Sequence, residues 1–257
     1  MKNVWGDDEF VIALNNQLKH NSPVTRNEMF DYGRINLVDE LIDIKKSDVI
    51  LDIGCGNGST LQKYHYAHYL VGVDISNLLC RNAKNNLKNG EIVLASMEHL
   101  PFRNNTFDKI IAVYSVLYSS QEKTFSEISR LLKDNGAFVL YDPNKLSMRT
   151  VIRKFIALKL RLSGDVNNPR YIHHSIATQK AMSYWDFKRM GKDVHLTIDT
   201  WCGVFSYHMI IPEKFYPFLF SKFHYKQWGF IAGIKFFSDF LLIKFIKEPS
   251  DKDPNKQ

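Results

Sequence analysis

Apolar residues come in short continuous runs from residue 49 onward, and stretches with helical spacing separate these runs. Strands are predicted at Val49–Ile53, Tyr69–Val73, Glu91–Ala95, Lys109–Val113 and Ala137–Tyr141. Helices are predicted between them at Ser59–Tyr66, Asn77–Leu87 and Glu122–Leu132. Continuously apolar strands that alternate with helices indicate a parallel sheet covered on both faces. We therefore predict an α/β fold, a doubly wound parallel sheet with ligands at the strands' carboxyl ends.

The flanking segments complete the predicted domain. Two amphipathic helices, Asp7–Lys19 and Arg26–Ile44, precede the sheet. After residue 144 we predict a basic helix at Leu146–Leu162, strands at Val194–Ile198, Val204–Ile211 and Phe240–Ile246, and a helix that starts within Pro212–Phe220. One domain is expected over residues 1–247, made of N-terminal helices (1–44), a core (45–144) and a third segment (145–247). The charged, proline-containing tail 248–257 is predicted to be disordered.

Composition narrows the class of protein. The three cysteines among the 257 residues are an odd number without a CxxC pair, so neither a disulfide framework nor a zinc cluster is expected. His173 and His174 are adjacent, and no other His, Cys, Asp or Glu group has a ligand spacing, so we predict no metal. The N-terminus lacks the basic and apolar pattern of a signal peptide. A cytoplasmic protein is expected.

A glycine-rich turn follows the first predicted strand. Gly54, Gly56 and Gly58 form G-x-G-x-G around Cys55, and Asp52 stands two residues before the first glycine. Dinucleotide sites instead use G-x-G-x-x-G, which presents a helix N-terminus to a pyrophosphate. An acid at Asp52 would repel a pyrophosphate but favour a cationic amino group, such as that of S-adenosylmethionine (SAM). The loop therefore favours SAM over NAD, unless it is a turn and nothing more.

A second acid stands at the end of the next predicted strand. Asp74 comes 20 residues after Gly54 and is followed by Ile75. A carboxylate at the end of this strand can accept two hydrogen bonds from ribose hydroxyls. The alternative is a solvated strand end. Together with the glycine turn, this interval predicts a nucleoside site that includes Cys55 and Ile75.

Three further segments carry a resemblance to the class I SAM-dependent methyltransferases, particularly the ubiquinone and menaquinone methylases within methyltransferase type 11. Ser96–Phe102 (SMEHLPF) resembles the family's D-A-E-x-L-P-F stretch, and Thr106–Ile111 resembles its S-F-D-x-V-x strand. Glu127–Ala137 is similar to E-x-x-R-V-L-K-P-G-G. The resemblance covers roughly residues 45–144. It implies a doubly wound Rossmann-like sheet of seven mostly parallel strands, and an enzyme that transfers a methyl group from SAM.

The resemblance also assigns individual residues. Ser96 takes the place of the family's adenine-binding acid, and Met97 and Glu98 are expected to add adenine contacts. Tyr114 is placed beside the cofactor, and Tyr118 stands where many relatives carry a histidine. Ordinary aromatic packing is the alternative for both tyrosines. The stretch lacks the N/D-P-P-Y/F motif of adenine and glutamine N-methyltransferases, which makes those activities unexpected.

The acceptor must be recognised outside the shared core. A general base is needed only if the acceptor keeps a proton at neutral pH, and the candidates are Tyr118, Tyr141, Asp142, His173, His174 and His208. Of these, Tyr118, Asp142 and His173 are the residues we select. Any single histidine is more often structural.

Charge is divided unevenly along the chain. Residues 1–144 carry 15 basic and 18 acidic residues, and residues 145–257 carry 19 and 9, a net charge of −3 against +10. With 20 aromatic residues in the second part, this pattern fits a small-molecule acceptor that is anionic or lipid-linked. The structural alternative is that these aromatic residues form core and the lysines a solvated surface. RNA methylation, contact of the basic helix with an anionic membrane, and SAM binding without catalysis are the functional alternatives.

Overall fold

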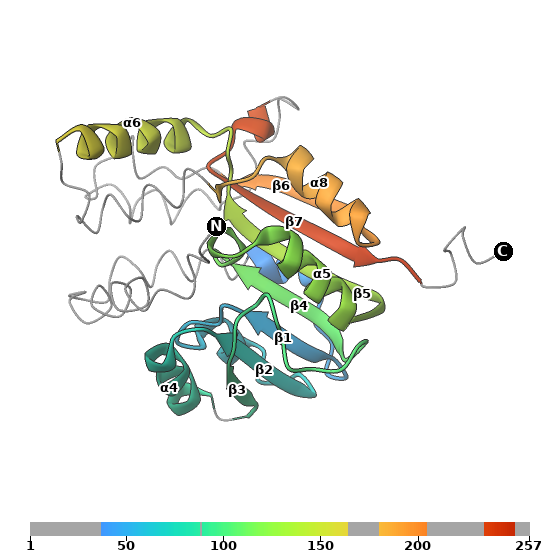
Figure 1. The fold of residues 1–257 in the computed structure, drawn as a ribbon. Coiled ribbons are helices and arrows are strands. Elements are labelled where there is room, and N and C mark those ends of the chain that lie inside the picture. Colours follow the sequence, from blue (N-terminus) through green and yellow to red (C-terminus); the bar gives the residue numbers. More distant parts are fainter. Residues whose placement is uncertain (1–36, 88, 164–179, 205–233, 250–257) are drawn as a thin grey trace, which may run out of the picture.

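The computed structural model of the chain describes residues 37–87, 89–163, 180–204 and 234–249, and every structural statement below concerns these residues. One sheet contains seven strands in the order β3-β2-β1-β4-β5-β7-β6 (Figure 1). Their bounds are Val49–Ile53 (β1), Tyr69–Asp74 (β2), Glu91–Leu94 (β3), Phe107–Val113 (β4), Leu132–Pro143 (β5), Leu196–Val204 (β6) and Phe240–Lys247 (β7). Strand β7 runs antiparallel to both of its neighbours, and the other six strands run in one direction. The predicted doubly wound, mostly parallel sheet is confirmed.

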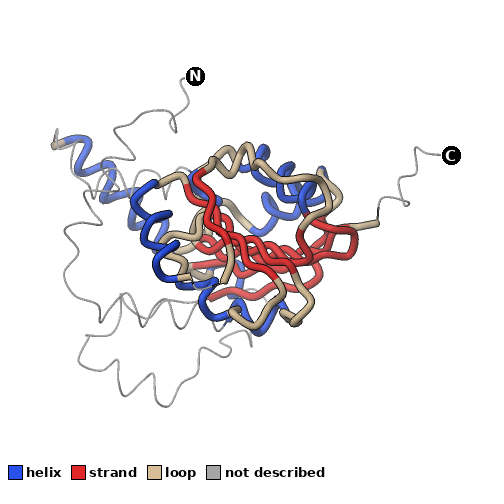
Figure 2. Tube along the Cα trace, turned by 90° about the horizontal axis from the view of Figure 1, so that it is seen from below, coloured by secondary structure: helices blue, strands red, loops and turns tan. Residues whose placement is uncertain are grey.

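Helices cover both faces of the sheet (Figure 2). The labelled helices of the described residues are Ser59–Lys63 (α3), Asn77–Asn86 (α4), Gln121–Leu131 (α5), Met148–Leu162 (α6) and Tyr184–Asp193 (α8), with short 3-10 turns at Val116–Tyr118 (η1) and Ile234–Phe237 (η4). Residues 37–42 are also helical. Successive side chains of a strand point to opposite faces of the sheet, so the core has two parts. Phe138 belongs to the part with α5 and α8, and Val139 to the part with α3 and residues 37–42. No helix within the described ranges has the length and apolar content of a membrane span.

The sequence-based predictions fail mainly after β5. Strand β6 runs without interruption from Leu196 to Val204, so the gap between the strands predicted at Val194–Ile198 and Val204–Ile211 is wrong. Residues 205–211 of the second predicted strand lie outside the described residues. A register shift between Ile198 and Thr200 in this edge strand disturbs the alternation of apolar residues. Helix α8 was not predicted, and the helices Asp7–Lys19 and Pro212–Phe220 lie outside the described residues.

The order of the strands indicates where the sheet would bind a ligand. The chain forms β1, β2 and β3 outward in one direction and then returns, so that β4 pairs with the other side of β1. In open parallel sheets, ligands bind beyond the carboxyl ends of the strands where the order reverses in this way. The ligand site is therefore expected where β1 and β4 end.

A cluster of four phenylalanine rings joins the sheet to α5 and α8. The Phe125 ring of α5 is buried. Its centroid lies 5.6 Å from the ring centroid of Phe138 of β5, 6.0 Å from that of Phe187 of α8 and 5.5 Å from that of Phe245 of β7. Edge-to-face and stacked pairs at these separations are favourable beyond the area that they bury. Phe125 is thus the ring that links both helices to the sheet.

We predict that Phe125→Ala lowers the free energy of unfolding by about 3–5 kcal/mol, since it leaves a cavity between three other rings. Phe155→Ala on α6 is the matched control, because Phe155 is 67% exposed. Its effect should stay within about 0.5 kcal/mol. Urea denaturation followed by circular dichroism measures both values, and equal losses in the two variants would contradict this account of the core.

Candidate functional site

The glycine turn connects β1 to α3. Gly54 has a φ of 74° and Gly56 a φ of 55°, a backbone conformation that glycine adopts without a steric penalty. The Gly54 and Cys55 amides both donate to the Val73 carbonyl, with N···O distances of 2.7 and 3.0 Å. A Cβ on Gly54 would lie 2.4 Å from the Ser115 Cβ, so only glycine lets the loop pass this close to β4's end. The turn is thereby held against both neighbouring strands.

Asp74 closes the turn from the end of β2. Its Oδ2 accepts a hydrogen bond from the Gly56 amide at 3.0 Å, and its Oδ1 accepts one from the Ser76 amide at 2.8 Å. Burial raises the pKa of this carboxyl, and the hydrogen bonds from backbone amides oppose the rise. Each carboxylate oxygen can accept a second hydrogen bond. Asp74 can therefore hold the loop and still accept two ligand hydroxyls.

Asp52 lies beneath the turn, within β1. It is buried, and its Oδ2 has no hydrogen-bond partner among the described residues. Burial, and secondarily the nearby charge of Asp74, raise the pKa of Asp52 to about 7. A buried carboxylate oxygen without a partner is costly unless a donor reaches it. Asp52 does not itself line the cavity described next.

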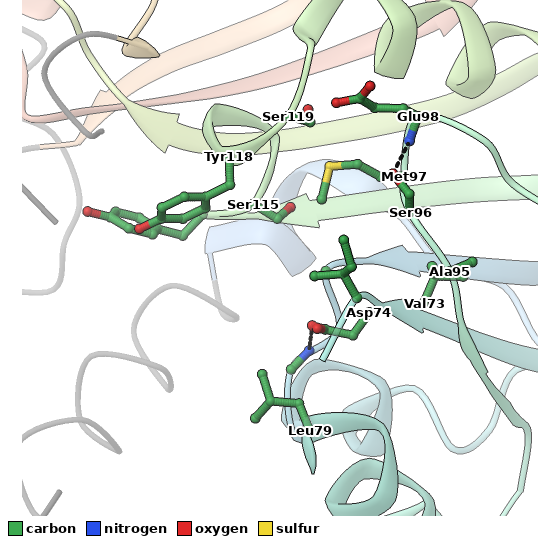
Figure 3. A pocket seen from close by; sticks show the side chains of 14 residues that line it. Val73, Asp74, Leu79, Ala95, Ser96, Met97, Glu98, Ser115, Tyr118 and Ser119 are labelled. Atoms are coloured by element: carbon green, nitrogen blue, oxygen red, sulfur yellow. Dashed lines mark hydrogen bonds between the residues drawn. The ribbon is translucent and has the colours of Figure 1, made fainter. Parts of the chain in front are cut away.

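A cavity of about 210 Å³ opens at the carboxyl ends of β1, β2, β3 and β4 (Figure 3). The predicted cofactor residues that line it are Gly54, Gly56, Asp74, Ile75, Ser96, Met97, Glu98 and Tyr114. Tyr118, predicted to be catalytic, lines it as well. Lining residues that were not predicted are Val73, Leu79, Ala95, Ser115 and Ser119. The structure thus brings most of the predicted site to one place.

The segment after β3 forms one wall of the cavity. The Ser96 Oγ accepts a hydrogen bond from the Glu98 amide at 3.3 Å. The Glu98 Oε1 accepts one from the Ser120 amide at 2.7 Å, so this carboxylate binds the start of α5. Figure 3 shows it pointing toward Ser119 and away from Asp74. Ser96, Met97 and Glu98 all line the cavity, and the Glu98 carboxylate also holds the start of α5.

The segment after β4 forms the opposite wall. Tyr114 has a φ of 55°, which is uncommon for a residue other than glycine and typical of functional sites. Its amide donates to the Tyr141 carbonyl at 2.7 Å, which ties this bend to β5. The rings of Tyr114 and Tyr118 lie 6.2 Å apart. Both tyrosines therefore line the cavity, and their rings also pack against each other.

Asp142 lies behind this wall and does not line the cavity. Its Oδ2 accepts a hydrogen bond from the Leu117 amide at 3.0 Å, within η1. Burial raises the pKa of Asp142 well above its usual value, opposed by hydrogen bonds from the Leu117 and Ser115 amides. Its Oδ1 has no partner among the described residues. This geometry positions η1, including Tyr118, and gives Asp142 no direct path to an acceptor.

Other predicted residues also lie away from the cavity. Gly58 begins α3, and a Cβ there would lie 3.2 Å from the Ala83 Cβ, so this glycine lets α3 and α4 pack closely. The Cys55 side chain is buried beside Gly72 of β2. His173 lies outside the described residues. In the described ranges, no group of three His, Cys, Asp or Glu residues could hold a metal ion.

Comparison with known proteins places this geometry in a family. Residues 51–140 match the family described as a methyltransferase domain. The chain is 30% identical over 228 residues to the sarcosine/dimethylglycine N-methyltransferase of Aphanothece halophytica, across 82% of this chain and 78% of that one. It is 36% identical over 115 residues to the uncharacterized protein MJ1252 of Methanocaldococcus jannaschii. That alignment spans 44% of each chain, less than half of that relative's length.

A solved structure supports the fold. The geranyl diphosphate C-methyltransferase of Streptomyces coelicolor A3(2), in complex with Mg²⁺, geranyl diphosphate and S-adenosyl-L-homocysteine, superposes with a TM-score of 0.59 at 17% identity. The match covers 86% of this chain and 80% of that one. None of these proteins is named as a ubiquinone or menaquinone methylase, so that finer resemblance stays a prediction. The chain belongs to the class I SAM-dependent methyltransferases, the enzyme family whose cofactor is SAM.

Proposed function

We propose that this chain transfers the methyl group of SAM to a small-molecule acceptor. The observation that carries the proposal is the cavity at the reversal of strand order, where the glycine turn, Asp74, Ser96 and Tyr118 meet. Bound SAM supplies a methyl group already activated by its sulfonium. The protein then has to align the acceptor with that methyl and exclude competing reactions.

The described residues fit SAM, and each has a distinct part in holding it. The free acceptor positions of the Asp74 carboxylate suit the two ribose hydroxyls. The unpartnered Oδ2 of Asp52 suits the cationic amino group of the methionine part. The Ser96 hydroxyl and the Met97 side chain border the space for adenine. A neutral hydroxyl binds the adenine amine more weakly than the acid usual in the family.

Tyr118 is the described residue best placed on the acceptor side. It lines the cavity, and Asp142 holds the turn from which it projects. We assign Tyr118 as the base for an acceptor that keeps its proton, and Asp142 as a positioning residue. His173, the third predicted catalytic residue, and much of the segment expected to bind the acceptor lie outside the described residues.

The class of acceptor is inferred from the substrates of related proteins and from the net charge of this chain. The relative from Aphanothece acts on sarcosine and dimethylglycine, and the structural neighbour acts on geranyl diphosphate, so the fold serves small acceptors of different chemistry. The net charge of +10 over residues 145–257 favours an anionic or lipid-linked acceptor here. No feature of the described residues favours RNA. An odd number of cysteines, three, without a CxxC pair supports a reducing compartment such as the cytoplasm.

We predict that SAM affinity rises as pH rises from about 5.5 to 7, approaching tenfold per pH unit for one ionisation. The pKa of Asp52 is raised to about 7, so the carboxylate that pairs with the cationic amino group forms over this range. For the stability of the free protein, the direction of the pH dependence is opposite. The raised carboxyl pKa contributes stability that is fully present below the ordinary pKa of 3.8 and is lost as the pH rises from there to about 7.

Titration calorimetry with SAM at several pH values measures this dependence. Asp52→Asn should bind SAM more weakly at pH 7 and lose the pH dependence, since no charge forms at that position. A wild-type profile that is flat, or one that Asp52→Asn leaves unchanged, would remove Asp52 from the SAM site.

Gly54→Ala should lower SAM affinity by about tenfold or more, because the added Cβ forces the turn away from Ser115. The double variant Gly54→Ala/Ser115→Gly removes the atom at 2.4 Å and leaves the Ser115 backbone at 3.8 Å. Calorimetry should show that this variant recovers part of the lost affinity. If it binds no better than Gly54→Ala, the close approach of the turn to β4 is not what limits binding.

Methyl transfer from labelled SAM to a panel of carboxylic acids, amines, phenols and prenyl lipids tests the activity itself. Tyr118→Phe keeps the ring beside Tyr114 and should leave SAM affinity unchanged. On an acceptor that carries a proton, it should lower kcat by about 100-fold or more, and on an unprotonated amine it should change kcat little. A protein that binds SAM but methylates no acceptor class would be a SAM-binding protein without catalysis, contrary to the proposal.

A further inference from the structure

Helix α6 carries a stripe of apolar side chains on its exposed surface. Val151, Phe155, Leu158 and Leu162 recur at intervals of four, three and four residues, which places them on one face of a helix. They are 39%, 67%, 52% and 79% exposed, respectively. Figure 1 shows α6 extending beside the body of the domain instead of across a sheet face. A stripe of this kind on a core helix would be buried.

Basic side chains border the stripe. Helix α6 contains five lysines and arginines and no acidic residue. Lys154 and Arg161 project on one side of the stripe and Lys159 on the other, as the 100° rotation per residue requires. All three are exposed, and in the described part of the chain none of them forms an ion pair. The surface therefore combines apolar area with positive charge that is not neutralised.

The start of the helix is fixed by buried hydrogen bonds. The Asn144 side chain donates to the Phe236 and Ser238 carbonyls at 2.8 and 2.9 Å. The Thr150 hydroxyl donates to the Asn144 carbonyl at 2.7 Å, and the Ser147 hydroxyl caps the helix by accepting from the Thr150 amide at 3.0 Å. These hydrogen bonds fix the first turn of α6 to the domain, while the apolar side chains of the stripe remain exposed.

We propose that α6 docks on the surface of an anionic phospholipid bilayer, with the Val151–Leu162 stripe inserted among the acyl chains. Fifteen residues of helix extend about 22 Å, too short to span but suited to lying in the interface. The basic side chains would meet the anionic headgroups. A second copy of α6 is a poor partner for the stripe, since two helices without acidic residues repel each other.

Docking would also orient the methyltransferase cavity. Helix α6 begins five residues after the end of β5, the strand whose Asp142 holds the turn beneath Tyr118. A helix lying on the bilayer would therefore bring the carboxyl edge of the sheet toward the lipid. The docking surface is separate from the cavity, so it can be tested without knowledge of the acceptor.

Co-sedimentation of the full chain with vesicles tests the proposal. The protein should bind vesicles of phosphatidylcholine mixed with phosphatidylglycerol and should bind pure phosphatidylcholine much more weakly. Phe155→Gln/Leu158→Gln removes apolar area at constant charge, and should lower partitioning on the order of tenfold or more. Replacing Lys154, Lys159 and Arg161 by Gln should lower it about fivefold per charge.

Leu94→Gln is the matched control. Leu94 is 54% exposed, as Leu158 is 52% exposed, but it lies on β3 at the opposite edge of the sheet. Its partitioning should equal that of the wild type, and circular dichroism confirms that each variant is folded. Equal binding to both kinds of vesicle, no binding, or binding that the α6 variants leave unchanged would overturn the proposal. So would light scattering that shows a dimer dispersed by Phe155→Gln/Leu158→Gln.

Discussion

The Asp74 carboxylate accepts hydrogen bonds from two backbone amides that belong to different connections of the sheet. Gly56 lies in the turn after β1, and Ser76 caps α4 after β2. A charged acceptor holds such amides more firmly than a neutral one. Without it, the Gly56 amide would lose its hydrogen bond to β2, and only the Gly54 and Cys55 amides would hold the turn to the end of that strand. The same carboxylate faces the cavity, so one side chain both shapes the site and serves it.

A second buried carboxylate, that of Asp142, holds the cavity wall formed by the segment after β4. Asp142, at the end of β5, accepts from the Leu117 amide and fixes the turn that presents Tyr118. Asp52, beneath the glycine turn, keeps an oxygen without a described partner, and its pKa is raised to about 7. Three carboxyl groups buried at one sheet edge are costly in the free protein. That cost is reasonable where a cationic ligand offsets part of it.

The core of the fold was predictable because its signals are local. The β1 strand is continuously apolar and ends in the glycine turn, and its predicted bounds, Val49–Ile53, match those found. Asp74 was recognised from its interval after that turn. By contrast, Ser115 faces Gly54 only because β4 returns to pair with β1. Nothing in the neighbourhood of Ser115 in the sequence indicates that contact.

Elsewhere the prediction failed for identifiable physical reasons. The capping box of Ser183 and Asp186 is a helix-start signal that could have revealed α8. Edge strand β6 pairs with β7 alone and carries exposed polar residues, so its pattern resembles two short strands. Asp142 has the chemistry of a base, but burial and backbone hydrogen bonds, which depend on tertiary structure, make it a positioning residue.

A crystal structure of the full chain with S-adenosyl-L-homocysteine tests the central claim most directly. The account predicts the ribose hydroxyls on the Asp74 carboxylate, the amino group within hydrogen-bond distance of Asp52, and the adenine beside Ser96 and Met97. A ligand bound elsewhere, or one in this cavity whose ribose makes no contact with Asp74, would contradict it.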